Sequence, residues 1–324
     1  MTLDEPAYPR ESGKRDRWIV ERRPRRNKVD SNRPNAFFTE REPDGRGDVV
    51  SQATILLTNR ECPWRCLMCD LWRNTLTERL AAGRVPQQID HALSRLPAAR
   101  QVKLYNSGSF FDPGAIPVAD HPSIAELVKS FERVVVECHP TLVNRRCVEF
   151  AGRLDGRLEV AMGLETAHPE ILDRLNKRMT LEDFRRASAF LGAGELSLRV
   201  FILVKPPFIT SEEEAIHWAG RSIDYAFDCG ARVVTLIPTR PGNGALDTLA
   251  RQGWFAPPRL ATLEACLQYG LRLGRGLVLA DLWDLERFRG CEDCFAGRKA
   301  RLERMNLSQS IEGGIHCPRC SGGE

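Results

Sequence analysis

The sequence has no apolar run close to the ~20 residues that a membrane-spanning helix needs. Its first residues are charged, unlike an apolar secretory signal, so we expect a cytoplasmic protein with no membrane contact. It has no GxGxxG pattern after its first expected strand, which argues against a dinucleotide-binding fold. Its formal net charge of +4 is too small to indicate a nucleic-acid partner by itself.

Length and composition indicate one main domain with an appendage. The 324 residues, of which 42% are hydrophobic and 28% charged, can bury a large core. Residues 1–50 are rich in charge and proline and contain a basic run at 22–28. We therefore expect a partly disordered arm there, with a nucleic-acid contact as the alternative. The expected main domain covers residues 51–285, and a cysteine-rich tail covers 286–324.

From residue 51 onward, short apolar runs rich in β-branched residues alternate with stretches of helical period. This alternation predicts six β-then-α units with parallel strands, hence either a doubly wound sheet or a partial barrel. The expected strands are 53–58, 101–106, 133–138, 157–164, 196–204 and 232–237. The expected helices lie near 88–96, 122–131, 144–153, 180–192, 211–228 and 259–273, with N-caps at Asp120, Asn144, Thr180 or Ser211.

Cysteine is abundant: the chain has eleven, and seven of them occur in CxxC-type groups. In a long chain without a secretory signal, such grouping favours metal binding in a reducing compartment over disulfides. The other four are scattered, and we expect ordinary buried thiols. They are Cys138, Cys147, Cys229 and Cys266.

Three of the grouped cysteines, Cys62, Cys66 and Cys69, follow the first expected strand in a CxxxCxxC spacing. A closed structural zinc site needs four protein ligands. A [4Fe-4S] cluster held by three thiolates instead keeps one iron open to an outside ligand, and we predict such a cluster here. The alternative is a zinc site completed by a remote His or Cys.

The other four grouped cysteines form two CxxC pairs, Cys291 with Cys294 and Cys317 with Cys320, separated by 22 residues. They suffice for a closed tetrahedral zinc site that holds the tail, which is our first interpretation. A second Fe–S cluster is the alternative, because both accept four thiolates. His316 could replace one thiol. In the zinc interpretation the segment is structural and could present four cations to a phosphate backbone: Arg298, Lys299, Arg301 and Arg304.

Polar residues follow the expected strands, and in parallel α/β folds the strand ends meet at one rim, where chemistry collects. These residues are Asn106, Ser107, Gly108, Ser109, Glu137, His139, Glu165 and Lys205. Taken alone, the turn at 106–109 would be an ordinary turn.

The cysteine motif after the first strand of a six-unit β/α chain resembles the radical S-adenosylmethionine (SAM) superfamily. The resemblance implies a partial (β/α)6 barrel and a [4Fe-4S] cluster on Cys62, Cys66 and Cys69. It also implies that SAM binds to the free iron through its amino and carboxylate groups. Reduction of SAM would release a 5′-deoxyadenosyl radical that abstracts a hydrogen atom.

The same resemblance implies roles for single residues. Trp64, inside the motif, would pack near the adenine of SAM, and the turn at 106–109 would hold the SAM amino group in place of the more usual Gly-Gly-Glu. Glu165 would contact the ribose or the methionyl end, and Arg199 would pair with the SAM carboxylate, which a guanidinium fork suits. The structural alternatives are a hydrophobic contact for Trp64, an N-cap or salt bridge for Glu165, and a structural ion pair for Arg199.

Four longer phrases resemble the Elp3-like branch of the superfamily, most closely the subfamily that contains the radical SAM subunit of archaeosine synthase. They are YNSGSFFDP (105–113), VECHPTLV (136–143), GLETAHPEILDRLNKRMTLEDFRRA (163–187) and LVKPPFITSEEEAI (203–216). This resemblance spans about residues 50–320. It implies radical cleavage of a carbon–nitrogen bond in a lysine adduct of a 7-deazaguanine base in tRNA, leaving a formamidine.

On that analogy Lys205, Glu137 and His139 would face the substrate. SAM would be consumed as a cosubstrate, a partner transferase would supply the adduct, and a flavodoxin or ferredoxin would supply electrons. The alternatives are a rim salt bridge for Lys205 and a satisfied turn residue for His139. Two other functions stay open: radical SAM chemistry on a small molecule or peptide, and a zinc-dependent nucleic-acid-binding protein in which both cysteine groups are structural.

Overall fold

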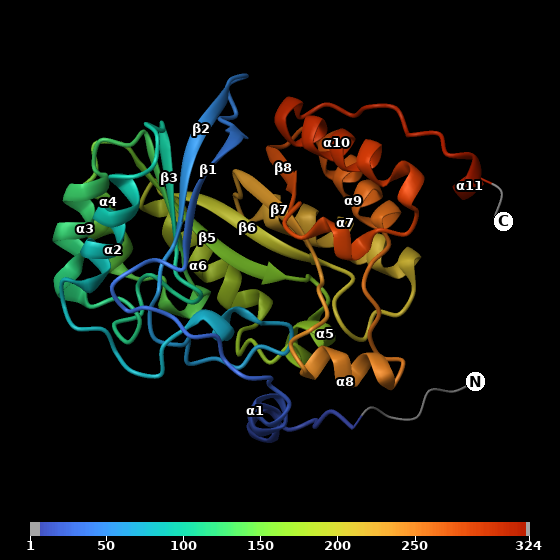
Figure 1. Ribbon diagram of the computed structural model, residues 1–324, viewed down its shortest axis with the longest axis horizontal. Helices are drawn as coiled ribbons and strands as arrows, with labels where there is room; N and C mark the ends of the chain where they lie inside the picture. Colours follow the sequence, from blue (N-terminus) through green and yellow to red (C-terminus); the bar gives the residue numbers. More distant parts are fainter. Residues whose placement is uncertain (1–6, 322–324) are drawn as a thin grey trace.

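One sheet of eight strands forms the centre of the molecule (Figure 1). The computed structural model of the protein describes residues 7–321. The strands are β1 (Ala36–Pro43), β2 (Val49–Leu56), β3 (Gln101–Tyr105), β4 (Arg133–Glu137), β5 (Arg157–Glu165), β6 (Ser197–Val204), β7 (Val233–Pro238) and β8 (Leu277–Ala280).

Helices connect and cover these strands. The α-helices are α1 (Ser12–Glu21), α2 (Arg84–Leu93), α3 (His121–Val128), α4 (Arg145–Ala151), α5 (Pro169–Arg174), α6 (Leu181–Ala193), α7 (Glu212–Asp228), α8 (Ala245–Arg251), α9 (Leu260–Leu273), α10 (Glu292–Ser308) and α11 (Pro318–Ser321). Short 3-10 helices are η1 (Leu71–Asn74), η2 (Val118–Asp120), η3 (Pro140–Leu142) and η4 (Leu285–Phe288). Within residues 7–321, none of the helices has both the length and the apolar character that crossing a bilayer requires.

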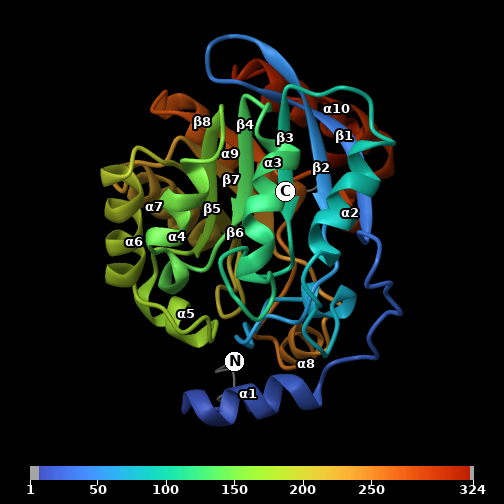
Figure 2. The same cartoon turned by 90° about the vertical axis from the view of Figure 1, so that its left-hand side faces the viewer.

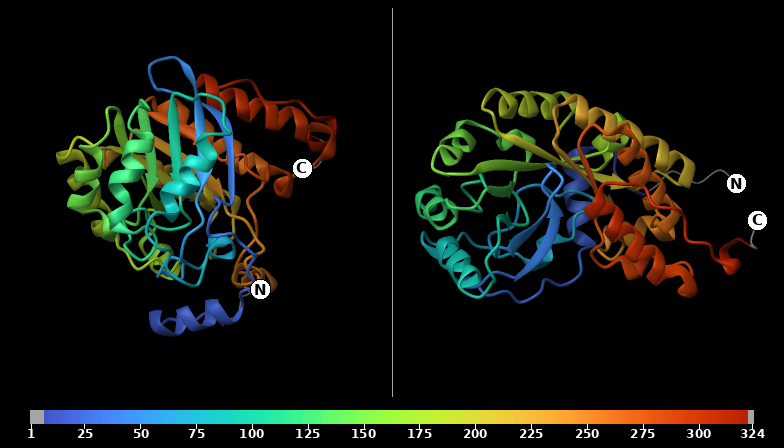
Figure 3. Two further views of the ribbon diagram at one scale, coloured as in Figure 1. Left: turned by 60° about the vertical axis from the view of Figure 1, so that its left-hand side comes forward. Right: turned by 90° about the horizontal axis from the view of Figure 1, so that it is seen from above.

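The strands lie side by side in chain order from β1 to β8. β1 runs antiparallel to β2, and every later pair of neighbours is parallel. Because the order never reverses, each crossover advances in the same direction, and the sheet lacks the switch point of a doubly wound fold. The result is a curled half-barrel with helices on its outer face (Figure 3).

An apolar layer joins the outer face of the sheet to the helices. Outward-facing strand residues such as Ile55, Leu104 and Val160 are fully buried in one cluster with Ile89 of α2 and Phe184 of α6. Burial of each such side chain stabilises the fold by about 1.5–3 kcal/mol. The helices therefore fix the strands from outside, which leaves the inner face and the rim available for polar groups.

The six predicted strands correspond to β2 through β7, and the predicted partial barrel is confirmed. The six predicted helices correspond to α2, α3, α4, α6, α7 and α9. Asn144, Thr180 and Ser211 cap their helices through side-chain oxygens. Asp120 does not cap α3, because its carboxylate instead accepts a hydrogen bond from the backbone of Gly83 (2.7 Å).

Two strands were not predicted, and neither was the folded structure of the N-terminal region. β8 is short, and β1 carries the charged run Glu40, Arg41 and Glu42, which hides the strand pattern. The prediction of a partly disordered arm over residues 1–50 is wrong for residues 7–50, since α1 and β1 belong to the folded body; residues 1–6 lie outside the described part. The sheet therefore begins before the expected boundary at residue 51.

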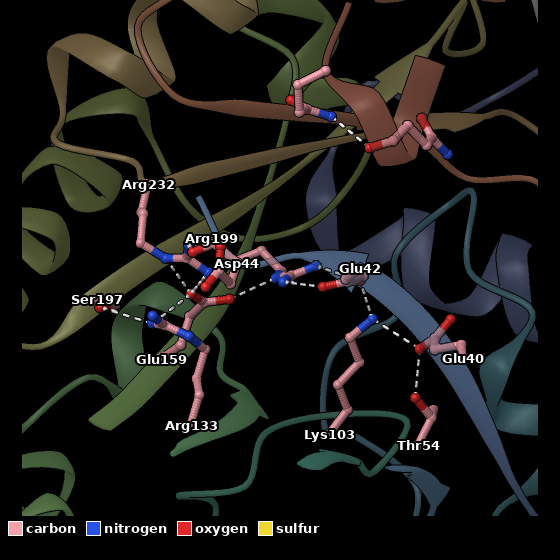
Figure 4. A network of polar contacts seen from close by, with 12 residues as sticks. Glu40, Glu42, Asp44, Thr54, Lys103, Arg133, Glu159, Ser197, Arg199 and Arg232 are labelled. Atoms are coloured by element: carbon pink, nitrogen blue, oxygen red, sulfur yellow. Dashed lines mark hydrogen bonds and ion pairs between the residues drawn. The ribbon is translucent and has the colours of Figure 1, made fainter. Parts of the chain in front are cut away.

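A buried network of charges holds β1 across the inner face of the sheet (Figure 4). Glu42 of β1 accepts hydrogen bonds from Arg199 of β6 (2.8 Å) and from Lys103 of β3. Glu159 of β5 accepts from Arg199 (2.7 Å) and also from Arg133 and Arg232. Burial alone would raise the pKa values of both glutamates, but Arg199 and the other cations lower each to about 2. Both carboxylates are therefore ionised at neutral pH.

Helix α10 packs against both edge strands, β1 and β8. Near its C-terminal end, Asn306 donates to the carbonyl of Ala280 and accepts from its N–H (both 2.8 Å). Gln309 makes the same two bonds with Val278 (3.0 and 2.8 Å). Two side-chain amides thus satisfy the free edge of β8 at alternate residues, as a neighbouring strand would. Part of the predicted tail is consequently an integral element of the barrel wall.

Candidate functional site

The loop after β2 carries the three N-terminal cysteines, and side chains tether its carbonyl groups. Arg65 donates to the carbonyl of Cys62 (2.5 Å), and the indole of Trp72 donates to the carbonyl of Cys69 (3.1 Å). Burial raises the pKa of each thiol, Cys62, Cys66 and Cys69, to about 12. The three thiols are therefore neutral on their own at neutral pH, and a bound metal would have to displace their protons.

The three thiols of this loop are not gathered as closely as the four C-terminal ones. Within residues 7–321, only one group of three or more His, Cys, Asp or Glu side chains has all its ligand atoms within 4.8 Å of one another, and it is not this one. A zinc ion needs its ligands gathered in one small shell. A cluster offers its iron atoms at separate corners. The loop supplies three thiols, the number that the predicted [4Fe-4S] cluster requires, and the cluster itself stays a prediction.

A basic segment that we call the N-terminal strap (residues 10–28) holds the start of the cysteine loop. Arg23 (2.7 Å) and Arg26 both donate to the carboxylate of Glu61, the residue before Cys62. Arg23 also lies over the ring of Trp72, 4.6 Å from its centroid. Burial alone would raise the pKa of Glu61, but Arg23 and Arg26 lower it. These two arginines are therefore part of the site's framework and not of a solvated arm.

The predicted turn at 106–109 lies against the cysteine loop. A Cβ added at Gly108 would lie 3.4 Å from the Cβ of Cys62, and Ser107 has a φ of +52°. Ser109 accepts a hydrogen bond from the backbone of His139 (2.7 Å), so its hydroxyl serves the fold. Asn106 is fully buried, yet neither atom of its amide has a hydrogen-bond partner among the described residues. A ligand at this turn would therefore find an amide free to bind it.

Trp64 stacks on His139, with ring centroids 3.9 Å apart and planes 9° apart. The Nε2–H of His139 donates to the carbonyl of Lys177 (2.9 Å), and Nδ1 lies 2.8 Å from the hydroxyl of Thr141. Burial, reinforced by Lys177, lowers the pKa of His139 to about 3. The ring is thus neutral with both nitrogens occupied, which supports the turn-residue alternative over the predicted contact with substrate.

Glu165 and Lys177 form a buried ion pair beside the cysteines. Burial alone would lower the pKa of Lys177, but Glu165 and then Cys66 raise it. A Cβ at Gly163 would collide with the charged ends of both side chains, so the pair needs a glycine there. Sequence analysis missed Lys177, although it lies in the longest of the quoted phrases (163–187), because no spacing rule connects it to Cys66.

Glu137 ends β4 next to the same turn. Its carboxylate accepts a hydrogen bond from the backbone of Asn106 (2.9 Å). Burial raises its pKa to about 7, although the backbone N–H groups of Asn106 and Ser107 oppose the rise. Glu137 can therefore exist as an acid or as a carboxylate near neutral pH, as a proton-transfer group must.

Two further predicted site residues are held in buried ion pairs. Arg199 lies near the start of β6, where both of its partners, Glu42 and Glu159, hold it in the buried network (Figure 4). It therefore takes the structural ion-pair alternative, and we no longer assign it to the SAM carboxylate. Lys205 is buried and paired with Glu212 at the start of α7. This salt bridge is the structural alternative for Lys205, and its predicted contact with substrate stays a prediction.

The four C-terminal cysteines come together at the N-terminal end of α10. The sulfur atoms of Cys291 and Cys317 are 3.8 Å apart, as are those of Cys294 and Cys320, and all four lie within 4.8 Å of one another. This set could hold a metal ion. His316 is exposed and is not a member of the set.

Each of the four cations expected to contact phosphate forms an ion pair with a glutamate. Arg298 and Arg301 pair with Glu264, Lys299 pairs with Glu286, and Arg304 pairs with Glu312. Their charge is thus neutralised within the protein, which argues against the predicted presentation to a nucleic acid.

No family model matches the chain. An uncharacterised protein of Methanocaldococcus jannaschii is 24% identical over 316 residues, which are 90% of this chain and 86% of that protein. Archaeosine synthase subunit beta of Methanosarcina acetivorans is 26% identical over 228 residues, 66% of this chain and 65% of that subunit. The subunit of the same name from Thermococcus kodakarensis is 27% identical over 167 residues, 49% of this chain and 51% of that subunit. The aligned parts thus span less than two thirds of both named subunits.

Among solved structures, Elp3 of Methanocaldococcus infernus with an N-terminal deletion has a TM-score of 0.48 at 15% identity and covers 60% of this chain and 51% of that chain. Methylornithine synthase (PylB) has a TM-score of 0.44 at 12% identity and covers 78% and 81%.

Two of these relatives thus carry the name of the subunit that the quoted phrases resemble.

Proposed function

We propose that the protein is a radical SAM enzyme that cleaves a carbon–nitrogen bond in a lysine-modified 7-deazaguanine of tRNA. The main support is the open three-cysteine loop at the rim of a half-barrel, in a chain similar to two archaeosine synthase beta subunits. A partner transferase would supply the lysine adduct, and a flavodoxin or ferredoxin would supply electrons.

Cys62, Cys66 and Cys69 would hold the [4Fe-4S] cluster, which together with bound SAM supplies the 5′-deoxyadenosyl radical. Trp64, whose ring orientation is fixed by stacking on His139, would provide the surface for adenine. His139 then acts as a positioning residue, because it touches Trp64 and Lys177 and no reacting group.

The turn from Asn106 to Gly108 would bind the methionyl amino group, because the amide of Asn106 has no partner among the described residues. The pair of Glu165 and Lys177 offers one acceptor and one donor, which suit a ribose hydroxyl and a carboxylate. Glu137 would exchange a proton with the substrate, since burial places its pKa at about 7.

Cys291, Cys294, Cys317 and Cys320 would bind one zinc ion with a structural role. Four sulfurs at 2.3 Å from a common centre in a tetrahedron lie about 3.8 Å apart. Two of the observed separations are 3.8 Å. A four-iron cluster would carry its ligands on four different metal atoms and spread the sulfurs further, so the compact set favours the single ion over the second cluster.

Reductive cleavage of SAM tests the radical SAM part of the proposal. After anaerobic reconstitution with iron and sulfide, the wild-type protein and dithionite should convert SAM to 5′-deoxyadenosine, which chromatography detects. Cys66→Ala should abolish this product. Cys229→Ala, which removes a half-buried thiol outside both groups, is the matched control and should retain it.

The substrate is tested separately. Mass spectrometry of tRNA that carries the lysine adduct should show conversion to the formamidine with wild-type protein and no conversion with Cys66→Ala. SAM cleavage without any change in the tRNA would instead favour radical chemistry on a small molecule or peptide. Two zinc ions per chain and no iron would favour the zinc-dependent nucleic-acid-binding alternative.

A further inference from the structure

The N-terminal strap contains the strongest local charge in the chain. Residues 10–28 hold nine Lys and Arg against three Asp and Glu, a net charge of +6. All other residues together hold 38 basic and 40 acidic side chains, a net charge of −2. The net positive charge of the protein therefore comes from one segment, and that segment contacts the cysteine loop.

The inner side of the strap binds protein groups around the candidate site. Arg15 donates to the backbone and carboxylate of Asp173 (2.7 and 2.9 Å), and Asp16 accepts from Asn176 (2.7 Å). Asn176 also donates to the carbonyl of Arg65 in the cysteine loop (2.8 Å). Further along, Arg23 and Arg26 bind Glu61, as described above. The strap is thus fastened at both ends to the residues that surround the cysteines.

The outer side of the strap carries cations of a different kind. Arg17, Arg25 and Lys28 are exposed, and within residues 7–321 none of them has an acidic partner in an ion pair. The exposed acids of the strap are already neutralised, since Glu11 pairs with Lys14 and Glu21 with Arg22. The outer side therefore presents uncompensated positive charge to solvent.

The strap lies at the end of the molecule where the chemistry is expected. Figures 1 and 2 show α1 as the outermost element beside α5 and α8, at the end opposite to the turn between β1 and β2. The cysteine loop and the turn at 106–109 lie at the same end, because parallel strands finish there. The strap and the cysteine loop thus lie at the same end of the molecule and are joined through Glu61.

We propose that the outer side of the strap, through Arg17, Arg25 and Lys28, binds the phosphate backbone of the tRNA substrate. This inference rests on the proposed function. Exposed Lys and Arg bind phosphate by releasing counterions, which makes binding steeply dependent on salt. The same segment clamps the cysteine loop on its inner side, so the RNA contact and the candidate metal site share one element.

Salt-dependent binding of a tRNA transcript to the anaerobic holoenzyme tests the inference. The variant carries Arg17→Gln, Arg25→Gln and Lys28→Gln, and fluorescence anisotropy gives Kd between low and moderate salt. Loss of three phosphate contacts should reduce the slope of log Kd against log salt by about 3. The matched control removes three exposed arginines at the opposite end of the strands, Arg46, Arg153 and Arg157, and should keep the wild-type slope.

Equal iron content and unfolding temperature in both triple variants establish that each is folded. An unchanged slope in the strap variant, or an equal loss in the control, would overturn the inference while the proposed function stands. Absence of tRNA binding by the wild-type protein, together with intact cleavage of SAM to 5′-deoxyadenosine, would overturn the tRNA part of the proposed function and this inference with it.

Discussion

Replacing Glu159 by Gln tests whether the buried charge network stabilises the half-barrel. The Glu159 carboxylate is fully buried and accepts hydrogen bonds from Arg199 (2.7 Å), Arg232 (2.8 Å) and Arg133 (3.2 Å). Glutamine keeps the shape but removes the charge, and its amide cannot accept from three guanidinium groups. Three cations would then lack their common partner.

Two arguments give a similar loss in the free energy of unfolding for this variant. Burial alone would raise the pKa of Glu159, but Arg199, Arg232 and Arg133 lower it from 4.5 to about 2. A shift of this size corresponds to about 3 kcal/mol at neutral pH. Breaking a buried ion pair by removing one partner costs about 3–5 kcal/mol. We therefore expect Glu159→Gln to lower the free energy of unfolding by about 3–5 kcal/mol.

Urea unfolding followed by circular dichroism measures this loss, with Glu303→Gln on the exposed side of α10 as the control. Because the pKa of Glu159 is depressed, its stabilisation is complete above pH 4.5 and declines as the pH falls toward about 2. The difference between wild type and variant should shrink over this range. A variant as stable as the wild type at pH 7, with the same acid profile, would refute the reasoning.

Three further predictions concern the rim and the edge. Gly163→Ala should displace the ion pair of Glu165 and Lys177, costing about 1–3 kcal/mol and weakening SAM binding in calorimetry; unchanged SAM affinity would contradict the role of the pair. Burial raises the pKa of Glu137 to about 7, so its neutral form stabilises the fold below pH 4.5 and this stabilisation is lost as the pH rises through 7. Glu137→Gln should reduce this loss, measured as the change of the urea midpoint with pH. A pH profile identical to that of the wild type would show that the carboxyl is not buried as described. A chelator that removes the metal proposed to bind the four C-terminal cysteines should loosen α10 and speed hydrogen exchange at the amides of Val278 and Ala280, whereas equal exchange before and after chelation would mean that these cysteines do not support the edge.

The strands with an apolar face were predictable, and the two edge strands were not. β2 through β7 contain apolar, β-branched residues because their outer faces pack against the helices. β1 has Glu40 and Glu42 on its inner side, where Lys103 and Arg199 neutralise their charges. A pairing between residues so distant in sequence leaves no local pattern.

The cysteine ligands were predictable from spacing, while their surroundings required the fold. The trio and the four C-terminal cysteines occupy short motifs with a chemical requirement, so the sequence shows them directly. Lys177 was missed because only the fold brings it beside Cys66. Arg23 and Arg26 were read as part of a solvated arm, because their partner Glu61 lies beyond β1 and β2 in the chain.

The coverage of β8 by the amides of Asn306 and Gln309 has a consequence for assembly. The free edge of a sheet can pair with a strand of another polypeptide, but the edge of β8 already forms hydrogen bonds with side chains of the same molecule. A polypeptide that adds a strand at β8 would have to displace four hydrogen bonds before it could bind there.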